Sequence, residues 1–242
     1  MVLGIMGRDG IGKTSVATAV GGYLARDDLT LIVNTDMTLP TTIRQGSGLR
    51  SLGHYLSLAS RRPVTSYFQQ HEKIKNLFFA GTSMLDDVFS YPVELDNTQQ
   101  ATYFIEEALK EVSHIVIDLS GQSMDSFLPV SVERADLPLF MTSCDAEGIN
   151  SLYAMQRLFK ASACPIRMAL SKTQAWHDIG AFEKTSERKA EYNFSFSKEL
   201  LYASACGQDI AREGKTGKLW DKEVRRLADD FLALVKKEEG DG

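Results

Sequence analysis

One short segment constrains the fold of this chain more than any other. Residues 7–14 have the sequence GRDGIGKT, which fits the pattern GxxxxGK[ST]. An apolar run at 2–6 precedes the segment and predicts a buried strand, and a helical pattern at 14–24 follows it. Strand, glycine-rich loop and helix in this order are the context in which the pattern forms a phosphate-binding loop. The sequence therefore predicts such a loop where the first strand ends.

The chemistry expected of this loop follows from its backbone and two side chains. Successive backbone N–H groups form a concave nest for an anion, which the positive end of the following helix caps. Glycines allow the backbone to approach the anion closely. We expect Lys13 to reach the β- and γ-phosphates of a nucleotide and the Thr14 hydroxyl to bind Mg²⁺. The predicted nucleotide-binding residues of the loop are Gly7, Arg8, Asp9, Gly10, Ile11, Gly12, Lys13, Thr14 and Ser15.

Short apolar runs alternate with helical patterns over the rest of the chain. Further strands are predicted at 29–34, 77–80, 115–118, 137–142 and 166–170. Repeated strand–helix–strand units form right-handed crossovers, which give a mainly parallel central sheet flanked by helices on both faces. We predict an α/β fold of the P-loop NTPase type, with one domain over residues 1–235 and a solvated tail at 236–242.

Polar residues follow several of the predicted strands. Asp36 follows the second strand, Asp118 ends the strand at 115–118, and Ser171 comes directly after the last one. The carboxyl ends of parallel strands share one edge of the sheet, and ligands bind beyond that edge. We therefore expect these three side chains to lie near the glycine-rich loop.

Two helices have a more specific sequence signal. Asp96 followed by Gln99 fits a capping box, which predicts that Asp96 caps the helix that follows. Near the C-terminus five large apolar residues recur at helical spacing, namely Trp220, Val224, Leu227, Phe231 and Leu234. The polar face of that segment mixes acidic and basic residues, which suits water better than an anionic membrane. We expect this helix to pack on the domain and not to serve as a membrane anchor.

Composition and charge narrow the range of partners. The formal net charge is −5, which argues against a surface that binds DNA, so nucleic acid is not expected as a partner. The three cysteines have no CxxC spacing and indicate neither a disulfide framework nor a zinc site. The sequence has no evident signal peptide and no stretch long enough to span a membrane. We expect a cytoplasmic protein, with the inner face of the membrane as an alternative location.

The phosphate loop resembles the deviant Walker A loop of the MinD/ParA ATPases. In that family a lysine and then a glycine follow the first glycine, whereas this chain has Arg8 and Asp9. The segment 34–36 resembles the Asp-x-Asp segment of switch I, with Asp36 at the second aspartate. The strand that ends at Asp118 resembles the one that carries the Walker B aspartate, followed by x-Ser-Gly where the family has x-Pro-Pro. The atypical TadZ/CpaE proteins of pilus assembly also have altered phosphate loops.

The resemblance implies that ATP lies between two subunits of a homodimer. Arg8 would reach the phosphates bound by the partner subunit, as the family lysine does. Asp36 would orient the attacking water, and Asp118 would hold the Mg²⁺ shell and couple loss of the γ-phosphate to switch II. On this resemblance the catalytic residues are Lys13, Asp36 and Arg8. The metal ligands are Thr14, Asp36 and Asp118.

Two further positions bear on the identity of the nucleotide. GTP-selective relatives carry Asn-Lys-x-Asp after a late strand, where the aspartate binds guanine. Here residues 171–174 are Ser-Lys-Thr-Gln, without an acidic residue, so ATP with Mg²⁺ is the predicted cofactor. We expect Ser171 and Phe196 to line the side of the site that holds the base.

Three functions are compatible with these patterns, and the first is the leading hypothesis. A MinD/ParA-like ATPase would dimerise around ATP and act as a localisation or assembly switch with a protein partner. A nucleotide-binding scaffold with little or no hydrolysis is the second, because Arg8, Asn34 and the x-Ser-Gly segment depart from the family pattern. A small-molecule ligase of the related synthetase group is the third, with Arg50, Arg61 and Arg62 as substrate anchors.

Overall fold

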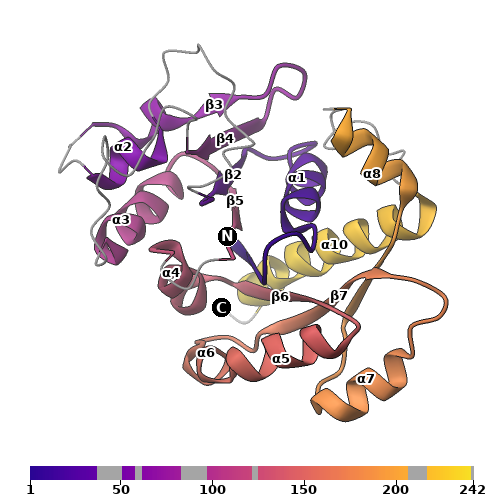
Figure 1. Ribbon diagram of the computed structural model, residues 1–242. Helices are drawn as coiled ribbons and strands as arrows, with labels where there is room; N and C mark the ends of the chain where they lie inside the picture. The colour runs from indigo at the N-terminus through magenta and orange to yellow at the C-terminus, as the bar shows by residue number, and fades with distance from the viewer. Residues whose placement is uncertain (37–50, 58–61, 83–96, 122–124, 207–216, 241–242) are drawn as a thin grey trace.

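The computed structural model describes residues 1–36, 51–57, 62–82, 97–121, 125–206 and 217–240, with side chains up to residue 234 in the last range. Within these residues the chain forms an eight-stranded sheet between two layers of helices (Figure 1). The order of the strands across the sheet is β3-β4-β2-β5-β1-β6-β7-β8. Neighbouring strands are parallel except β3 and β4, which are antiparallel. The predicted α/β fold with a mainly parallel central sheet is confirmed.

The strands are short, and those at the centre of the sheet are fully buried. Their bounds are β1 (Val2–Met6), β2 (Thr30–Asn34), β3 (Gln69–Gln70), β4 (Leu77–Gly81), β5 (His114–Asp118), β6 (Leu137–Ser143), β7 (Arg167–Thr173) and β8 (Tyr192–Ser195). Every residue of β1, β2 and β5 is buried. Helices cover both faces of a parallel sheet, so its central strands are nearly continuous apolar runs.

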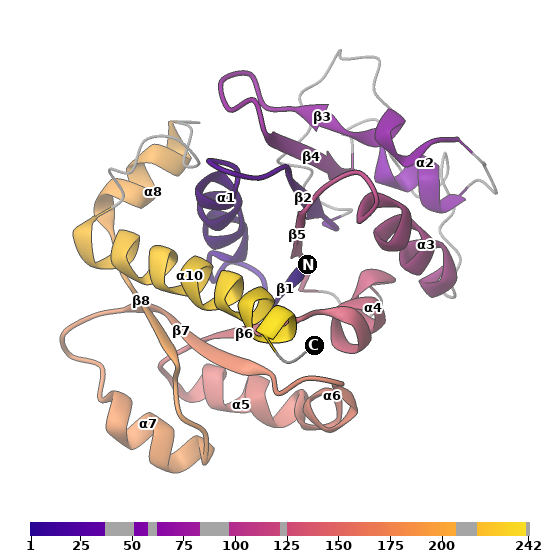
Figure 2. The ribbon, with the colours of Figure 1, turned by 180° about the vertical axis from the view of Figure 1, so that it is seen from behind.

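Helices pack on both faces of the sheet, as the two opposite views show (Figures 1 and 2). On one face α1 (Lys13–Leu24) lies beside α10 (Lys218–Gly240). The other face carries α3 (Thr98–Ala108), α4 (Phe127–Arg134), α5 (Ala146–Ala154) and α6 (Gln156–Ala161). Shorter elements are α2 (Leu52–Ser57), the 3-10 helix η1 (Val64–Tyr67), α7 (Ile179–Ser186) and α8 (Lys198–Ala205).

Two hydrophobic clusters hold the layers together, one on each face of the sheet. Phe104, Phe127 and Phe140 belong to the cluster beneath α3 and α4. The cluster beneath α1 and α10 includes four of the predicted apolar residues of α10 as buried side chains, and Leu234 packs against it partly buried. The prediction that the C-terminal helix packs on the domain is therefore confirmed. No helix in the described part of the chain has the length and apolar character needed to cross a membrane.

The strand order places a change of direction next to β1. After β1 the chain crosses to β2 on one side of β1, whereas β6, which follows β5, lies on the other side. The register pairs Asp118 at the end of β5 with Ile5 of β1 and Asn34 of β2. A reversal of this kind opens a crevice at the carboxyl ends of the strands, and the loop after β1 lies at that crevice.

Some element boundaries differ from the sequence-based expectation. Neither β3 nor β8 was predicted, although the residues of β8 follow a buried–exposed alternation that indicates a strand. The N-cap of α3 is Asn97, without a side-chain hydrogen bond, and the predicted cap Asp96 lies outside the described residues. α10 extends through Gly240, into the segment expected to be a solvated tail.

Candidate functional site

The loop after β1 has a backbone that requires glycine. The φ angles of Gly7, Gly10 and Gly12 are 138°, 75° and 94°. Residues that carry a Cβ atom rarely adopt such positive values. A Cβ atom on Gly7 would lie 2.3 Å from the carbonyl oxygen of Met141 in β6. The first glycine of the motif therefore allows the loop to pack directly on the backbone of β6.

The helix that follows the loop, α1, begins without a side-chain cap. Its N-cap residue is Gly12, which offers no side-chain hydrogen bond, and the first turn carries no acidic residue. The first N–H groups of a helix have no partner within the helix, and the helix dipole makes this end positive. The start of α1 is therefore suited to bind an anion through backbone N–H groups.

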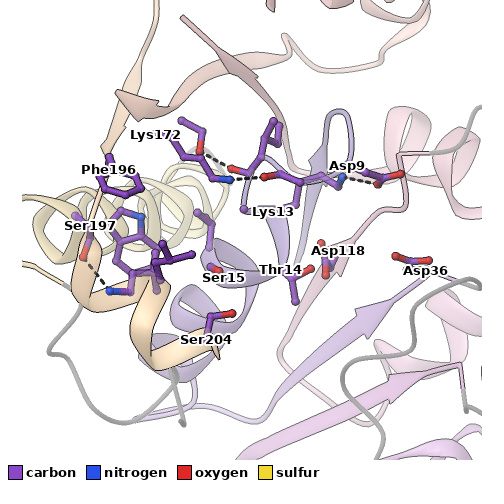
Figure 3. Close-up of a pocket in the computed structure, with 18 of the residues that line it drawn as sticks. Asp9, Lys13, Thr14, Ser15, Asp36, Asp118, Lys172, Phe196, Ser197 and Ser204 are labelled. Carbon is purple, nitrogen blue, oxygen red and sulfur yellow. Dashed lines mark hydrogen bonds and ion pairs between the residues drawn. The ribbon is translucent and has the colours of Figure 1, made fainter. Parts of the chain in front are cut away.

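A cavity of about 370 Å³ opens at this helix end. It has the size of a small-molecule pocket. Asp9, Asp36 and Asp118 lie at one end of it, and Lys13, Thr14 and Ser15 come next (Figure 3). The other end is formed by α8 and the residues around it, namely Phe196, Ser197, Leu200, Leu201, Ser204 and Trp220. An elongated ligand can thus contact the loop and α8 at the same time.

Lys13 is a buried cation that lines this cavity. Lys13 is only 6% exposed, and its Nζ atom donates a hydrogen bond of 2.8 Å to the carbonyl oxygen of Arg8. Nζ also lies 3.3 Å from Oδ1 of Asp9. A buried ammonium group that faces a nest of backbone donors is the arrangement expected for binding phosphates.

Thr14 and Asp118 form a site that fits Mg²⁺. Asp118 accepts a hydrogen bond of 2.7 Å through Oδ2 from the side-chain amide of Asn34. Its Oδ1 atom is buried without a hydrogen-bond partner among the described residues, and the Thr14 hydroxyl lies beside the carboxylate (Figure 3). Mg²⁺ favours hydroxyl and carboxylate oxygens together with waters and substrate phosphates. The described residues contain no group of three or more acidic, histidine or cysteine side chains that would hold a metal alone.

The protonation of Asp118 reflects its position inside the protein. Burial raises the pKa of Asp118 to about 6, and the charge of Asp36 adds to this effect. The Thr14 hydroxyl, the Lys13 ammonium group and the Asn34 amide act in the opposite direction. The raised pKa shows that these partners compensate the carboxylate only in part, which favours the binding of a cation next to it.

Two further aspartates lie in the segments that follow β2 and β5. They are Asp36, which the sequence predicted, and Asp125, which it did not. Asp36 lines the cavity at the Asp118 end, and its backbone N–H donates to Oδ1 of Asn34 at 3.2 Å. Asp125 accepts hydrogen bonds from the Thr35 hydroxyl and from the backbone N–H and hydroxyl of Ser120, the latter two at 3.0 Å. This carboxylate therefore joins the segment after β2 to the segment after β5. No pattern in the sequence singles out Asp125, because Thr35 lies 90 residues away along the chain and comes next to Asp125 only in the folded sheet.

Both residues predicted to face the base line the cavity, and Phe196 is the one that lies at the end near α8. Ser171 lines the cavity, but its hydroxyl donates to the carbonyl oxygen of Ile11 at 2.5 Å, so it also supports the phosphate loop. Phe196 is 38% exposed and lines the cavity next to Ser197, which caps α8 by accepting a hydrogen bond from Leu200. Lys172, which the sequence did not single out, binds the carbonyl oxygen of Gly10 through Nζ.

Gly7 and Arg8 do not line the cavity. The guanidinium group of Arg8 forms an ion pair with Glu147 of α5, and it donates a hydrogen bond of 3.3 Å to the Ser143 hydroxyl. Within this single chain Arg8 therefore points away from the cavity. Its predicted role concerns a second subunit and stays a prediction.

The ligase hypothesis requires arginines at the cavity, and the structure describes only one of its three candidates. Arg62 is exposed and does not line the cavity. Arg50 and Arg61 lie outside the described residues. The geometry thus gives this hypothesis no support.

Known proteins resemble this chain in structure rather than in sequence. No protein-family model matches it, and no curated protein matches its sequence. A ParA family ATPase from Chlorobium tepidum has 15% identity and a TM-score of 0.74, over 94% of this chain and 98% of that chain. MinD from Pyrococcus horikoshii, complexed with Mg-ADP, has 15% identity and a TM-score of 0.73, over 93% and 95% of the two chains. A McdA variant from Cyanothece in complex with ATP has 16% identity and a TM-score of 0.72, over 96% of each.

The likeness covers the whole domain and not only the phosphate loop. Sequence identities this low establish a shared architecture, and function depends on the site that the architecture carries. In this chain the phosphate loop follows β1, and the two aspartates that resemble family residues follow β2 and end β5. The chain therefore has the fold of the ParA and MinD P-loop ATPases.

Proposed function

We propose that this protein binds ATP with Mg²⁺ at the cavity beside α1, dimerises around it, and acts as a slow ATPase in a localisation or assembly switch. One observation carries the proposal above all others. Buried Lys13 and Asp118 converge with the half-buried Thr14 at a helix start without a side-chain cap, in a cavity long enough to reach α8. The solved structures of the same fold with ATP and with Mg-ADP support it.

Each group in the cavity has a distinct task in this proposal. The backbone donors of the loop and the Lys13 ammonium group bind the phosphates, and Thr14 with Asp118 would hold Mg²⁺, which neutralises phosphate charge. Asp36 lies at the phosphate end of the cavity, where it can orient a water molecule toward the terminal phosphate. Phosphoryl transfer of this kind depends mainly on positioning and on charge stabilisation. At the other end Phe196 offers an aromatic face to the base.

Replacement of Asp36 tests the hydrolytic part of the proposal. We expect Asp36→Ala to lower the rate of phosphate release about a hundredfold, because a side chain that positions or activates water contributes roughly that much. ATP affinity should change by no more than about threefold, since Lys13 and the loop remain. The measurement is single-turnover phosphate release, with Asp27→Ala as a matched control on an exposed aspartate at the far end of α1. An unchanged rate in Asp36→Ala would refute its catalytic role.

Replacement of Arg8 tests the dimer. Arg8 is proposed to leave Glu147 and to contact phosphates bound by a second subunit through its guanidinium group. Arg8→Ala should therefore keep nucleotide affinity in the monomer but raise the dimer dissociation constant with ATP about tenfold or more. Analytical ultracentrifugation with a non-hydrolysable ATP analogue measures this, and Arg62→Ala serves as the control. Equal dimerisation of Arg8→Ala and the unmodified chain would remove the cross-subunit role.

A scaffold that binds ATP and hydrolyses little is the second candidate. Asn34 favours it, because a neutral amide stands beside Asp118 where the family sequence has an aspartate. Such a protein would form a dimer with ATP that persists without release of phosphate. Phosphate release below the detection limit, together with a stable dimer, would select this candidate over the switch.

A further inference from the structure

Asp9 occupies a position that the general pattern of the loop does not explain. Its Oδ1 atom lies 3.3 Å from Nζ of Lys13 and accepts a hydrogen bond of 2.8 Å from the backbone N–H of Gly121. An ammonium group of the phosphate loop and an amide of the segment after β5 thus converge on one carboxylate oxygen. The Asp9 carboxylate packs closely against the backbone of Gly121, since a Cβ atom on Gly121 would lie 2.4 Å from the same oxygen.

Asp9, which both donors contact, lies at the end of the cavity where a terminal phosphate would be bound. Asp9, Asp36 and Asp118 are together at that end, and Phe196 is at the opposite end (Figure 3). A nucleotide with its base near Phe196 therefore extends its last phosphate toward Asp9. The oxygen atoms of that phosphate require the same donors that Asp9 already uses, and they carry charge of the same sign.

We propose that Asp9 is a specificity residue that competes with the terminal phosphate of a nucleoside triphosphate, so that the site favours ADP over ATP. This inference rests on the proposed nucleotide site. A diphosphate fills the nest of the loop and leaves the contact between Asp9 and Gly121 in place. A triphosphate displaces the Asp9 carboxylate from both donors, which costs two charge-assisted interactions and places two negative groups close together.

The side chain of Asp9 can make this exchange without disturbing the core. Its side chain is 67% exposed, whereas that of Lys13 is 7% exposed. Rotation of Asp9 into solvent leaves Lys13 in the same place, held by the carbonyl oxygen of Arg8 at 2.8 Å. Binding of ATP is therefore weakened and not abolished, and a high concentration of ATP still fills the site.

The test compares two nucleotides on three forms of the full chain. Isothermal titration calorimetry with Mg-ADP and with the Mg complex of a non-hydrolysable ATP analogue is carried out on the unmodified chain, Asp9→Asn and Asp27→Asn. Asp27→Asn removes the same charge from an exposed position at the other end of α1. We expect Asp9→Asn to lower the ratio of the ATP-analogue to the ADP dissociation constant about tenfold, with ADP affinity nearly unchanged. Asp27→Asn should leave the ratio as it is.

The possible outcomes separate this inference from the function on which it rests. If all three forms bind both nucleotides and share one ratio, the role of Asp9 is wrong while the nucleotide site stands. If Asp9→Asn weakens both nucleotides equally, Asp9 supports the loop and does not select the ligand, which also overturns the inference. If no form binds either nucleotide, the proposed function and the inference fall together.

Discussion

Lys13→Ala is expected to weaken the binding of both ADP and ATP by at least about a hundredfold. The ammonium group is nearly buried and is held in the loop by the carbonyl oxygen of Arg8. Each hydrogen bond from a charged group contributes about 1.5–3 kcal/mol, and Lys13 is placed to contact two phosphates. Among the described residues the other lysine that lines the cavity is Lys172, and it uses its Nζ atom on the carbonyl oxygen of Gly10.

Equilibrium titration of a fluorescent nucleotide measures this effect. Lys110→Ala is the matched control, since Lys110 is exposed and pairs only with Glu107 among the ion pairs of the described residues. Thermal unfolding of each variant without nucleotide shows whether the loop still folds. Retained affinity in a folded Lys13→Ala protein would mean that residues 7–14 do not bind the phosphates.

Asp118→Asn is expected to make the nucleotide-free protein more stable at pH 8 than the unmodified chain. Burial raises the pKa of Asp118 from 3.8 to about 6 in the folded state, so the folded protein retains a proton that the unfolded chain has lost. Stability contributed by this group is therefore present below pH 4 and is lost as the pH rises to about 6. The size of the pKa shift corresponds to a loss of about 3 kcal/mol in the free energy of unfolding. Asparagine does not titrate and avoids this loss.

With Mg²⁺ and nucleotide bound, we expect the unmodified chain to be more stable than Asp118→Asn at pH 8. With Mg-ADP the unmodified chain gains stability at pH 8, because a cation next to Asp118 compensates its charge, whereas the gain of Asp118→Asn is smaller. Urea unfolding at pH 4.5, 6 and 8, with and without Mg-ADP, measures both effects. Asp125 also has a pKa raised by burial, but it is present in both proteins and cancels in the comparison. Lower stability of Asp118→Asn than of the unmodified chain at pH 8 without nucleotide would contradict the assignment.

The features that sequence reasoning predicted correctly are local or strongly patterned. β1, β2 and β5 are buried on both faces, so their apolar runs identify them without knowledge of the fold. The loop at residues 7–14 is also a local feature, since its residues are consecutive and lie between β1 and α1 as expected. Asp118 ends β5 as expected, whereas phosphate binding by the loop and the metal-binding role of Asp118 stay predictions.

The features that were missed depend on contacts between distant segments. Arg8 pairs with Glu147 and Asp9 with Gly121, and neither partner is apparent until β5, β6 and α5 are placed next to the loop. Asp125 joins Thr35 to Ser120 in the same way. β8 was missed because it has only four residues and its alternation is short. Tertiary packing, and not intrinsic propensity, determines these details.

Light scattering on a sizing column, with released phosphate assayed in the same samples, tests the central claim most directly. The chain is measured at saturating Mg-ADP and at saturating Mg-ATP, so that weak binding of ATP does not limit the result. We expect a monomer near 26.8 kDa with Mg-ADP and a species of twice that mass with Mg-ATP, which decays as phosphate appears. A monomer with both nucleotides would contradict the proposal of an ATP-dependent switch.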